Sequence, residues 1–126
     1  VERRRDVADR YYEGLEGLGG LVRLPVKLPR EQNAYHLFPI LCSRRDALQE
    51  HLKALGVQTL IHYPIPPHRQ DCYRRAIADG QLVLPVGGLP VTERIHAEEL
   101  SLPIGPTMSD DEASVVTDAV NSFSWI

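Results

Sequence analysis

The sequence lacks any hydrophobic run long enough to span a membrane, and it shows no signal-peptide pattern. Cysteine is scarce as well: Cys42 and Cys72 are far apart in the sequence and form no pair of the kind that binds a metal. These absences argue against a membrane partner and a disulfide-stabilised secreted fold. We therefore expect two reduced thiols in a cytoplasmic protein that needs neither a metal nor a disulfide to fold.

An excess of positive charge is also missing, since the formal net charge is −3 at pH 7. Arginine clusters occur at 3–5, 44–45 and 74–75, but each has acidic residues close by, and no aromatic residues are interleaved with them. A nucleic-acid-binding face would read as basic along its length. We therefore expect no nucleic-acid partner.

The length and composition are those of one ordinary globular domain. The 126 residues are 43% hydrophobic and 25% charged, which suits a soluble domain that buries roughly two-thirds of its unfolded surface. The first residue is Val1, and the sequence there already reads as the middle of a helix. We therefore expect the chain to be a fragment or an excised domain.

Hydrophobic periodicity predicts short strands alternating with helices. Pro39 inside the first predicted strand favours an edge position, because proline cannot donate to the ladder. Capping boxes are predicted at Ser43 with Asp46 and at Ser109 with Glu112, and Thr92 is a predicted N-cap. The predicted elements are a helix ending near Leu15, an extended segment over 21–33, strands over 34–41, 57–63 and 101–104, and helices after Ser43, over 70–78, from Thr92 to Leu100 and after Ser109.

This order predicts an α+β domain in which helices cover a small, mostly antiparallel or mixed sheet. If the first two predicted strands are parallel neighbours in one sheet, the unit from Ala34 to Tyr63 would be right-handed.

The most distinctive stretch runs from His62 to Gln70, between a predicted strand and a predicted helix. Its three prolines restrict the backbone and so reduce the entropic cost of ordering its polar groups. His62, His68 and Arg69 carry donors for an anion, and the Tyr63 hydroxyl donates or accepts. Such a loop suits a phosphate group or sugar hydroxyls.

Two other interpretations of this stretch remain open at the level of residues. It is also consistent with a stiff surface turn whose histidines are structural or solvated, because proline-rich turns are common without a function. A metal site formed by His62, His68 and Cys72 is a further alternative, although their spacing matches no zinc pattern and no fourth ligand is evident. The other histidines, His36, His51 and His96, are expected to be packing or surface residues.

The stretch His62-Tyr63-Pro64…Pro67-His68…Gln70, followed by Tyr73, resembles the C-terminal domain of the DegT/DnrJ/StrS family of sugar aminotransferases. Three further segments agree with that family in the same order and extend the resemblance over nearly the whole chain. They are Arg4-Arg5…Ala8…Tyr11…Leu15, then Tyr35-His36-Leu37-Phe38, and finally Glu93…Ala97-Glu98…Leu100-Ser101-Leu102-Pro103-Ile104…Pro106…Ser109.

The resemblance implies the C-terminal small domain of a fold-type I aminotransferase that depends on pyridoxal phosphate. Members transfer an amino group, commonly from glutamate, to a keto sugar attached to a nucleotide, and they work as homodimers with active sites at the subunit interface. By this resemblance, residues 1–126 form one domain, in which 1–18 is a helix linking from a large domain and 34–126 is the α/β core. The implied partners are the protein's own large domain, a second subunit and the nucleotide-sugar substrate.

The resemblance also implies roles for particular residues. His62 and Tyr63 match residues that lie near the sugar nucleotide, often approaching from the neighbouring subunit, and His68 is assigned the same role. Only Lys27 and Lys53 are present, and neither matches the family's cofactor lysine. We therefore expect no catalytic or cofactor-binding residue here, no metal site and no cofactor bound to this fragment. The alternative is a stand-alone, non-enzymatic α/β module that binds a small ligand or a protein.

Overall fold

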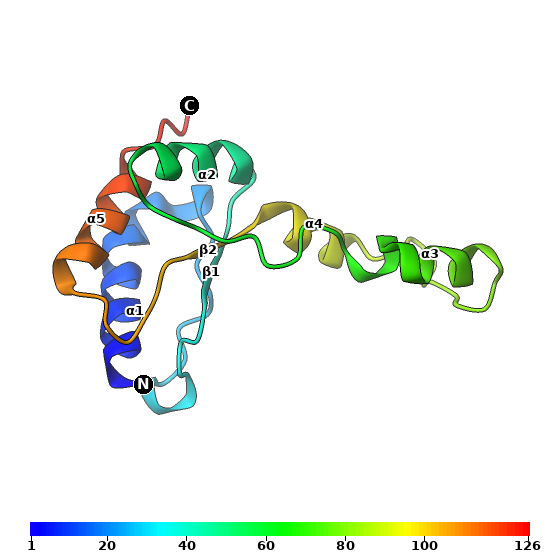
Figure 1. Ribbon diagram of the computed structural model, residues 1–126, viewed down its shortest axis with the longest axis horizontal. Helices are drawn as coiled ribbons and strands as arrows, with labels where there is room; N and C mark the ends of the chain where they lie inside the picture. Colours follow the sequence, from blue (N-terminus) through cyan, green and yellow to red (C-terminus); the bar gives the residue numbers. More distant parts are fainter.

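The computed structural model describes all of residues 1–126 and has two parts (Figure 1). We call residues 1–57 and 99–126 the body, and residues 58–98 the arm, which extends away from the body (Figure 1). The body contains α1 (Glu2–Leu15), β1 (Phe38–Leu41), α2 (Arg45–Ala54), β2 (Glu99–Leu102) and α5 (Asp110–Asn121), with 3₁₀ segments at Glu16–Leu21 and Arg30–Gln32. The arm contains a 3₁₀ turn at Pro67–Arg69, α3 (Asp71–Ala78) and α4 (Pro90–Glu98).

A two-stranded antiparallel sheet lies at the centre of the body. β1 pairs with β2 from Phe38 opposite Leu102 to Leu41 opposite Glu99. The side chains of Phe38 and Ile40 are fully buried, whereas Pro39 between them is exposed, as the alternation of a half-buried strand requires. The predicted fold class, helices on a small antiparallel sheet, is confirmed.

The helices α1 and α5 pack side by side in the same direction (Figure 1). Their first turns are joined by an ion pair of 2.6 Å between Arg3 and Asp110, and the Asn121 amide donates to the Gly14 carbonyl at 2.8 Å near their ends. A Cβ on Gly14 would lie 2.7 Å from the Thr117 methyl group. Glycine therefore permits this close approach. The predicted capping box of Ser109 and Glu112 begins α5 and is confirmed.

The strand predicted over 34–41 begins only at Phe38. Tyr35 has a φ of 46°, a left-handed conformation that is uncommon for a residue other than glycine. The Tyr35 amide donates to the Asn33 side-chain oxygen at 2.9 Å, and its ring packs near those of Tyr12 and Phe38. This turn breaks the extended conformation before the sheet begins.

The second predicted strand, over 57–63, is wrong. Only one bridge, between Leu60 and Ser101, joins this segment to the sheet, and β1 pairs instead with β2. The unit from Ala34 to Tyr63 is therefore not a parallel strand–helix–strand unit. Leu60 and Tyr63 are exposed, whereas Ile61 between them packs against the core.

Two predicted helix starts are also wrong. Helix α2 has Arg44 as its N-cap residue, with no side-chain capping bond, and Asp46 instead forms an ion pair with Arg45. Helix α4 begins at Pro90 rather than after Thr92, because proline suits the first helical turn, where its missing N–H is not needed. The helix predicted over 70–78 is confirmed as α3. No helix is long and apolar enough to cross a membrane.

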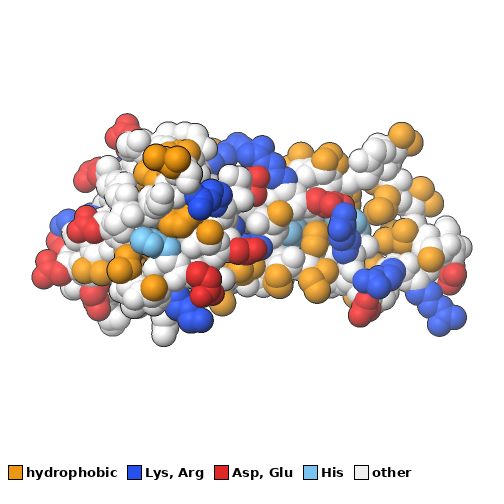
Figure 2. Space-filling model, turned by 90° about the horizontal axis from the view of Figure 1, so that it is seen from above, with side chains coloured by type: hydrophobic (Ala, Val, Ile, Leu, Met, Phe, Trp, Pro, Cys, Tyr) orange, Lys and Arg blue, Asp and Glu red, His pale blue; other side chains and the backbone are white.

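The body and the arm differ most in burial. All 21 buried residues lie in the body, and 19 of them form one hydrophobic cluster. None of residues 58–98 is buried, and hydrophobic side chains are spread over the arm at the right of Figure 2. The large exposed hydrophobic residues of the arm are Leu60, Tyr63, Ile65, Tyr73, Leu82, Val83, Val86, Val91 and Ile95.

Candidate functional site

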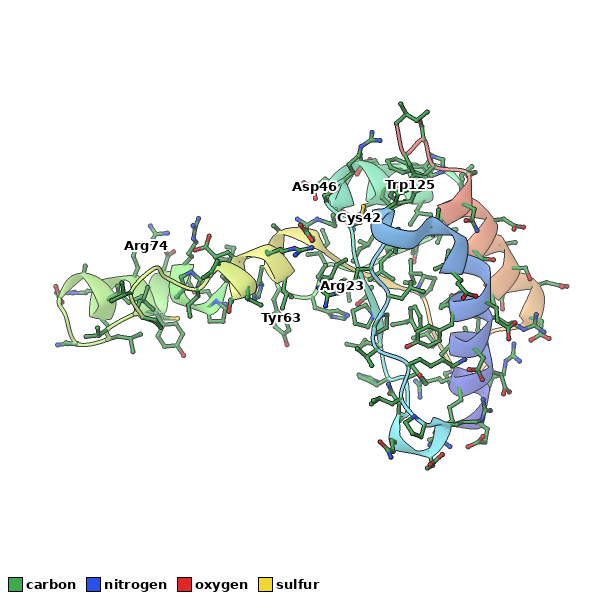
Figure 3. The ribbon with its side chains drawn as sticks, turned by 180° about the vertical axis from the view of Figure 1, so that it is seen from behind. Arg23, Cys42, Asp46, Tyr63, Arg74 and Trp125 are labelled. Carbon is green, nitrogen blue, oxygen red and sulfur yellow. The ribbon has the colours of Figure 1, made fainter.

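The stretch from His62 to Gln70 forms the base of the arm, between the Leu60 bridge and α3. Figure 3 shows Tyr63 projecting outward there, on the same side as Arg23 of the body. The Tyr63 side chain is exposed. The predicted loop between regular elements is therefore present, but it follows a single bridge instead of a strand.

His62 is half-buried beside Tyr63, with 6.4 Å between the ring centroids. Its Nε2 atom is buried and has no hydrogen-bond partner, a situation that is rare in folded proteins. Its backbone amide donates to the Glu99 carboxylate at 3.5 Å. The imidazole of His62 thus carries a buried polar atom that this chain leaves without a partner.

His68 and Arg69 face α4. His68 Nε2 lies 2.9 Å from Glu93 Oε1, and Arg69 Nη2 donates to Glu93 Oε2 at 2.5 Å. The His68 side chain is only 9% exposed, although its Nδ1 atom has no partner. Two of the predicted anion donors are thus already bonded to a carboxylate.

Glu93 is held in its ionised form by these neighbours. The hydrogen bond from His68, followed by that from Arg69, lowers the pKa of Glu93 from its ordinary value. One turn further along α4, His96 Nδ1 bonds to the Tyr63 carbonyl. Residues three apart on a helix share a face, so Glu93 and His96 both point toward the loop.

Sequence reasoning did not assign Glu93 or His96 to the site. His96 was expected to be a packing or surface residue, and Glu93 entered only as part of the family resemblance. The three-residue spacing of two polar residues on one helix was the available signal. This spacing points to the site only once the structure shows that α4 lies against the loop.

The arrangement does not create a metal site, because no group of three or more His, Cys, Asp or Glu side chains is placed to hold a metal ion. Of the proposed ligands, His68 bonds to Glu93, while Cys72 is exposed beside Gln70. The structure therefore gives no support to the set of His62, His68 and Cys72.

Neither lysine lies in an environment suited to a covalent cofactor bond. Lys27 pairs with Asp9 at 3.0 Å and lies 5.1 Å from the centroid of the Tyr12 ring. The hydrogen bond to Asp9 raises the pKa of Lys27, whereas an amine that attacks an aldehyde must be neutral. Lys53 is exposed on α2.

A cleft of ≈ 550 Å³ lies where the arm meets the body. Arg23 and Pro25 of the extended segment line one side, and Val91, Arg94 and Ile95 of α4 line the other. His62, Tyr63 and His68 are not among its lining residues. The cleft between the body and the arm is therefore separate from the loop of residues 62–70.

Known proteins resemble this chain along nearly its whole length. The family model described as the DegT/DnrJ/EryC1/StrS aminotransferase family matches residues 1–121. The chain belongs to this family. The resemblance stated from the sequence motifs is therefore confirmed.

Individual relatives agree with the family assignment. A dTDP-3-amino-3,6-dideoxy-alpha-D-galactopyranose transaminase from Aneurinibacillus thermoaerophilus is 36% identical over 124 residues, which are 98% of this chain and 31% of the relative. The erythromycin biosynthesis sensory transduction protein EryC1 from Saccharopolyspora erythraea is 44% identical over 90% of this chain and 29% of its own length. The chain therefore spans about a third of the length of the curated relatives it matches.

The solved structures point the same way. The crystal structure of Streptomyces venezuelae DesV in complex with a ketimine intermediate superimposes with a TM-score of 0.78 at 40% identity. The match covers 94% of this chain and 30% of the DesV chain. The arrangement of body and arm thus resembles one part of a larger aminotransferase.

Proposed function

We propose that this chain is the C-terminal small domain of a longer, pyridoxal-phosphate-dependent aminotransferase that acts on a keto sugar carried by a nucleoside diphosphate. Residues 1–126 form one domain, in which 1–18 lead out of a preceding large domain and 34–126 form the α/β core. The amino donor is glutamate, the donor that the family commonly uses. Family membership supports this proposal over a stand-alone binding module.

The observation that carries the proposal is the unsupported arm. Its nine large exposed hydrophobic residues lie within 41 residues, none of which is buried, whereas the 85 residues of the body hold eight. Exposed apolar side chains concentrated in this way are typical of a surface that another part of a protein covers. In the relatives, about two-thirds of the length lies outside the part that this chain matches. We propose that a corresponding part of the full-length protein covers the arm. We assign that cover to the large domain of the same chain and to a second subunit.

Within that assembly, the base of the arm forms a wall of the sugar-nucleotide site. The imidazole of His62, whose buried Nε2 atom has no partner in this chain, and the exposed side chain of Tyr63 supply polar groups of the kind that bond to phosphate oxygens or sugar hydroxyls. We give His68 the same binding role through its unpartnered Nδ1 atom. These three residues bind and orient, and the chemistry is supplied from elsewhere.

The cofactor belongs to the other part of the protein. Pyridoxal phosphate, when bound, carries the amino group between the two substrates. Lys27 is paired with Asp9 and Lys53 faces solvent, so we propose that neither binds it and that this chain alone does not transaminate. Purified chain mixed with pyridoxal phosphate should show no absorbance band that is lost in Lys27→Ala or Lys53→Ala.

The test is His62→Ala in the full-length protein. We expect kcat/KM for the nucleotide keto sugar to fall at least tenfold, because positioning contacts supply several kcal/mol of barrier reduction. The value for glutamate should stay within twofold, and the visible spectrum of the bound cofactor should not change. An unchanged rate at limiting sugar nucleotide would contradict the assignment.

A second function is favoured by one relative, the protein named for sensory transduction. A sensor would bind the sugar nucleotide without turnover. The same full-length protein separates the two functions, because an aminotransferase consumes glutamate when it is given the keto sugar, whereas a sensor binds the sugar nucleotide and consumes none.

A further inference from the structure

One face of α4 holds the proline-rich loop at both ends. Glu93 bonds to His68 and Arg69, which end the loop, and His96 bonds to the backbone carbonyl of Tyr63, near its start. The His62 amide also donates a weak bond of 3.5 Å to Glu99, the residue directly after α4. The bonds of Glu93 and His96 are therefore the main side-chain contacts between the loop and α4.

The segment between these two attachments is stiff. Pro64, Pro66 and Pro67 each have a restricted φ, and Pro66 also restricts Ile65 before it. A short stiff segment held at both ends has little freedom left between them. The placement of His62 and Tyr63 is therefore set on one side by the bridge between Leu60 and Ser101 and on the other by where α4 holds the loop.

Helix α4 is in turn fixed to the body at its C-terminal end. Arg45 of α2 donates through Nη1 to the carbonyls of His96 at 3.1 Å and Glu99 at 3.2 Å. The Arg45 side chain is only 11% exposed, and a cation is favourable at this end of a helix. The Cys42 amide also donates to the Glu98 carbonyl at 2.9 Å. These bonds form a continuous path from the core of the body, through α4, to the loop.

We propose that Glu93 and His96 are positioning residues, which hold His62 and Tyr63 in the orientation that binds the sugar nucleotide. This inference rests on the proposed function of the loop. Glu93 acts as a fixed charge between an imidazole and a guanidinium group, and His96 acts as a donor to one backbone carbonyl. Neither residue needs to touch the substrate, and Glu93, like any carboxylate of ordinary or lowered pKa, is ionised at neutral pH.

The test uses Glu93→Gln and His96→Ala in the full-length protein. Each should lower kcat/KM for the nucleotide keto sugar roughly 10- to 100-fold, the scale that a misplacement of about 1 Å produces. Most of the loss should appear in KM, and kcat/KM for glutamate should stay within twofold. Calorimetric titration with thymidine diphosphate, the nucleotide in the name of the Aneurinibacillus thermoaerophilus relative, should show weaker binding by a similar factor.

Two further variants provide the controls. His96→Asn keeps an N–H donor near the Tyr63 carbonyl and should recover at least half of the lost binding free energy. Glu98→Gln makes the same chemical change as Glu93→Gln on the same helix, but it breaks only the pair of 3.0 Å with Arg94. Its kinetic constants and its affinity for thymidine diphosphate should stay within twofold of the parent values.

The outcomes are distinguishable. If His62→Ala impairs use of the sugar nucleotide but Glu93→Gln and His96→Ala behave like Glu98→Gln, the positioning role is wrong and the proposed function stands. If His62→Ala has no effect either, both are wrong. Equal losses for glutamate and for the sugar nucleotide, together with a lowered Tm, would show a structural role only and would overturn the inference.

Discussion

The body and the arm both contain large hydrophobic residues, but these residues are mostly buried in the body and exposed in the arm. In the body, Phe38, Ile40 and Leu48 are fully buried in one cluster. In the arm, Val83 is 82% exposed, and the firmest contacts are polar ones, such as those of Glu93. The body is thus stabilised by its own hydrophobic core. The arm is held mainly by hydrogen bonds, and we expect residues outside this chain to cover its apolar side chains.

This difference separates stability from function within one domain. The residues of the hydrophobic core lie in the body, whereas the proposed binding residues lie at the base of the arm and none of them is buried. Substitutions in the body should therefore change the free energy of unfolding, and substitutions in the arm should change binding. The predictions below test that separation, from the largest expected effect on stability to the smallest.

Phe38→Ala should lower the free energy of unfolding by about 3–5 kcal/mol, because it opens a cavity among the rings of Tyr11, Tyr12 and Tyr35. Urea denaturation followed by circular dichroism measures the change. Ile40→Val removes one buried methylene from the same strand and should cost only about 0.5–1.5 kcal/mol. Similar losses for the two variants would mean that the body is not close-packed.

Gly14→Ala should lower the free energy of unfolding by about 1–3 kcal/mol, because the added methyl group would meet Thr117 at 2.7 Å. The combined variant Gly14→Ala with Thr117→Ser removes the opposing methyl group and should recover part of the loss. Gly17→Ala is the matched control, since no atom lies within 4 Å of its added Cβ. Equal behaviour of the two glycine variants would show that α1 and α5 do not depend on close contact.

Tyr11→Phe should cost about 1 kcal/mol at neutral pH, because the Tyr11 hydroxyl donates to the Pro103 carbonyl at 2.5 Å. Burial raises the pKa of Tyr11 above its ordinary value, so the folded state needs the neutral phenol. The stability that comes from keeping the Tyr11 phenol neutral and buried is present below pH ~10. It is lost as the pH rises above that value, because the unfolded chain then ionises its phenol first. Denaturation between pH 8 and 11 should show a smaller alkaline loss in Tyr11→Phe than in the parent.

Val83→Ala should change the free energy of unfolding by less than about 0.5 kcal/mol, because the side chain makes few contacts within the chain. In the full-length protein the same change should cost more, since there the side chain is covered. Thermal denaturation of both forms makes the comparison. A large loss in the isolated chain would contradict the view that the arm lacks a core of its own.

The body was largely predictable from sequence, because local signals decide its helices. The apolar spacing of Ala8, Tyr11 and Leu15 gave α1, and Ser109 with Glu112 gave the start of α5. These features depend on residues within one or two turns of each other. The order of the predicted helices and strands gave the fold class, and the family resemblance agreed with it.

The errors arose where distant segments decide the structure. Residues 57–63 alternate as a strand would, but pairing depends on which segment lies beside β1, and β2 takes that place. Ser43 was predicted to cap the following helix, but α2 has Arg44 as its N-cap residue. Likewise, the loop residues were recognisable, but their attachment to Glu93 and His96 depends on how α4 lies against them. His62, Tyr63 and His68 remain predictions as binding residues.

Hydrogen exchange over residues 58–98 tests most directly whether the arm is completed by the rest of a larger enzyme. In the isolated chain we expect the amides of α3 and α4 to exchange quickly, while those of α1 and α5 stay protected. In the full-length protein the arm should become protected, and thymidine diphosphate should slow exchange further at residues 62–69. Exchange in the arm that is equally fast in both proteins, with or without the nucleotide, would contradict the account.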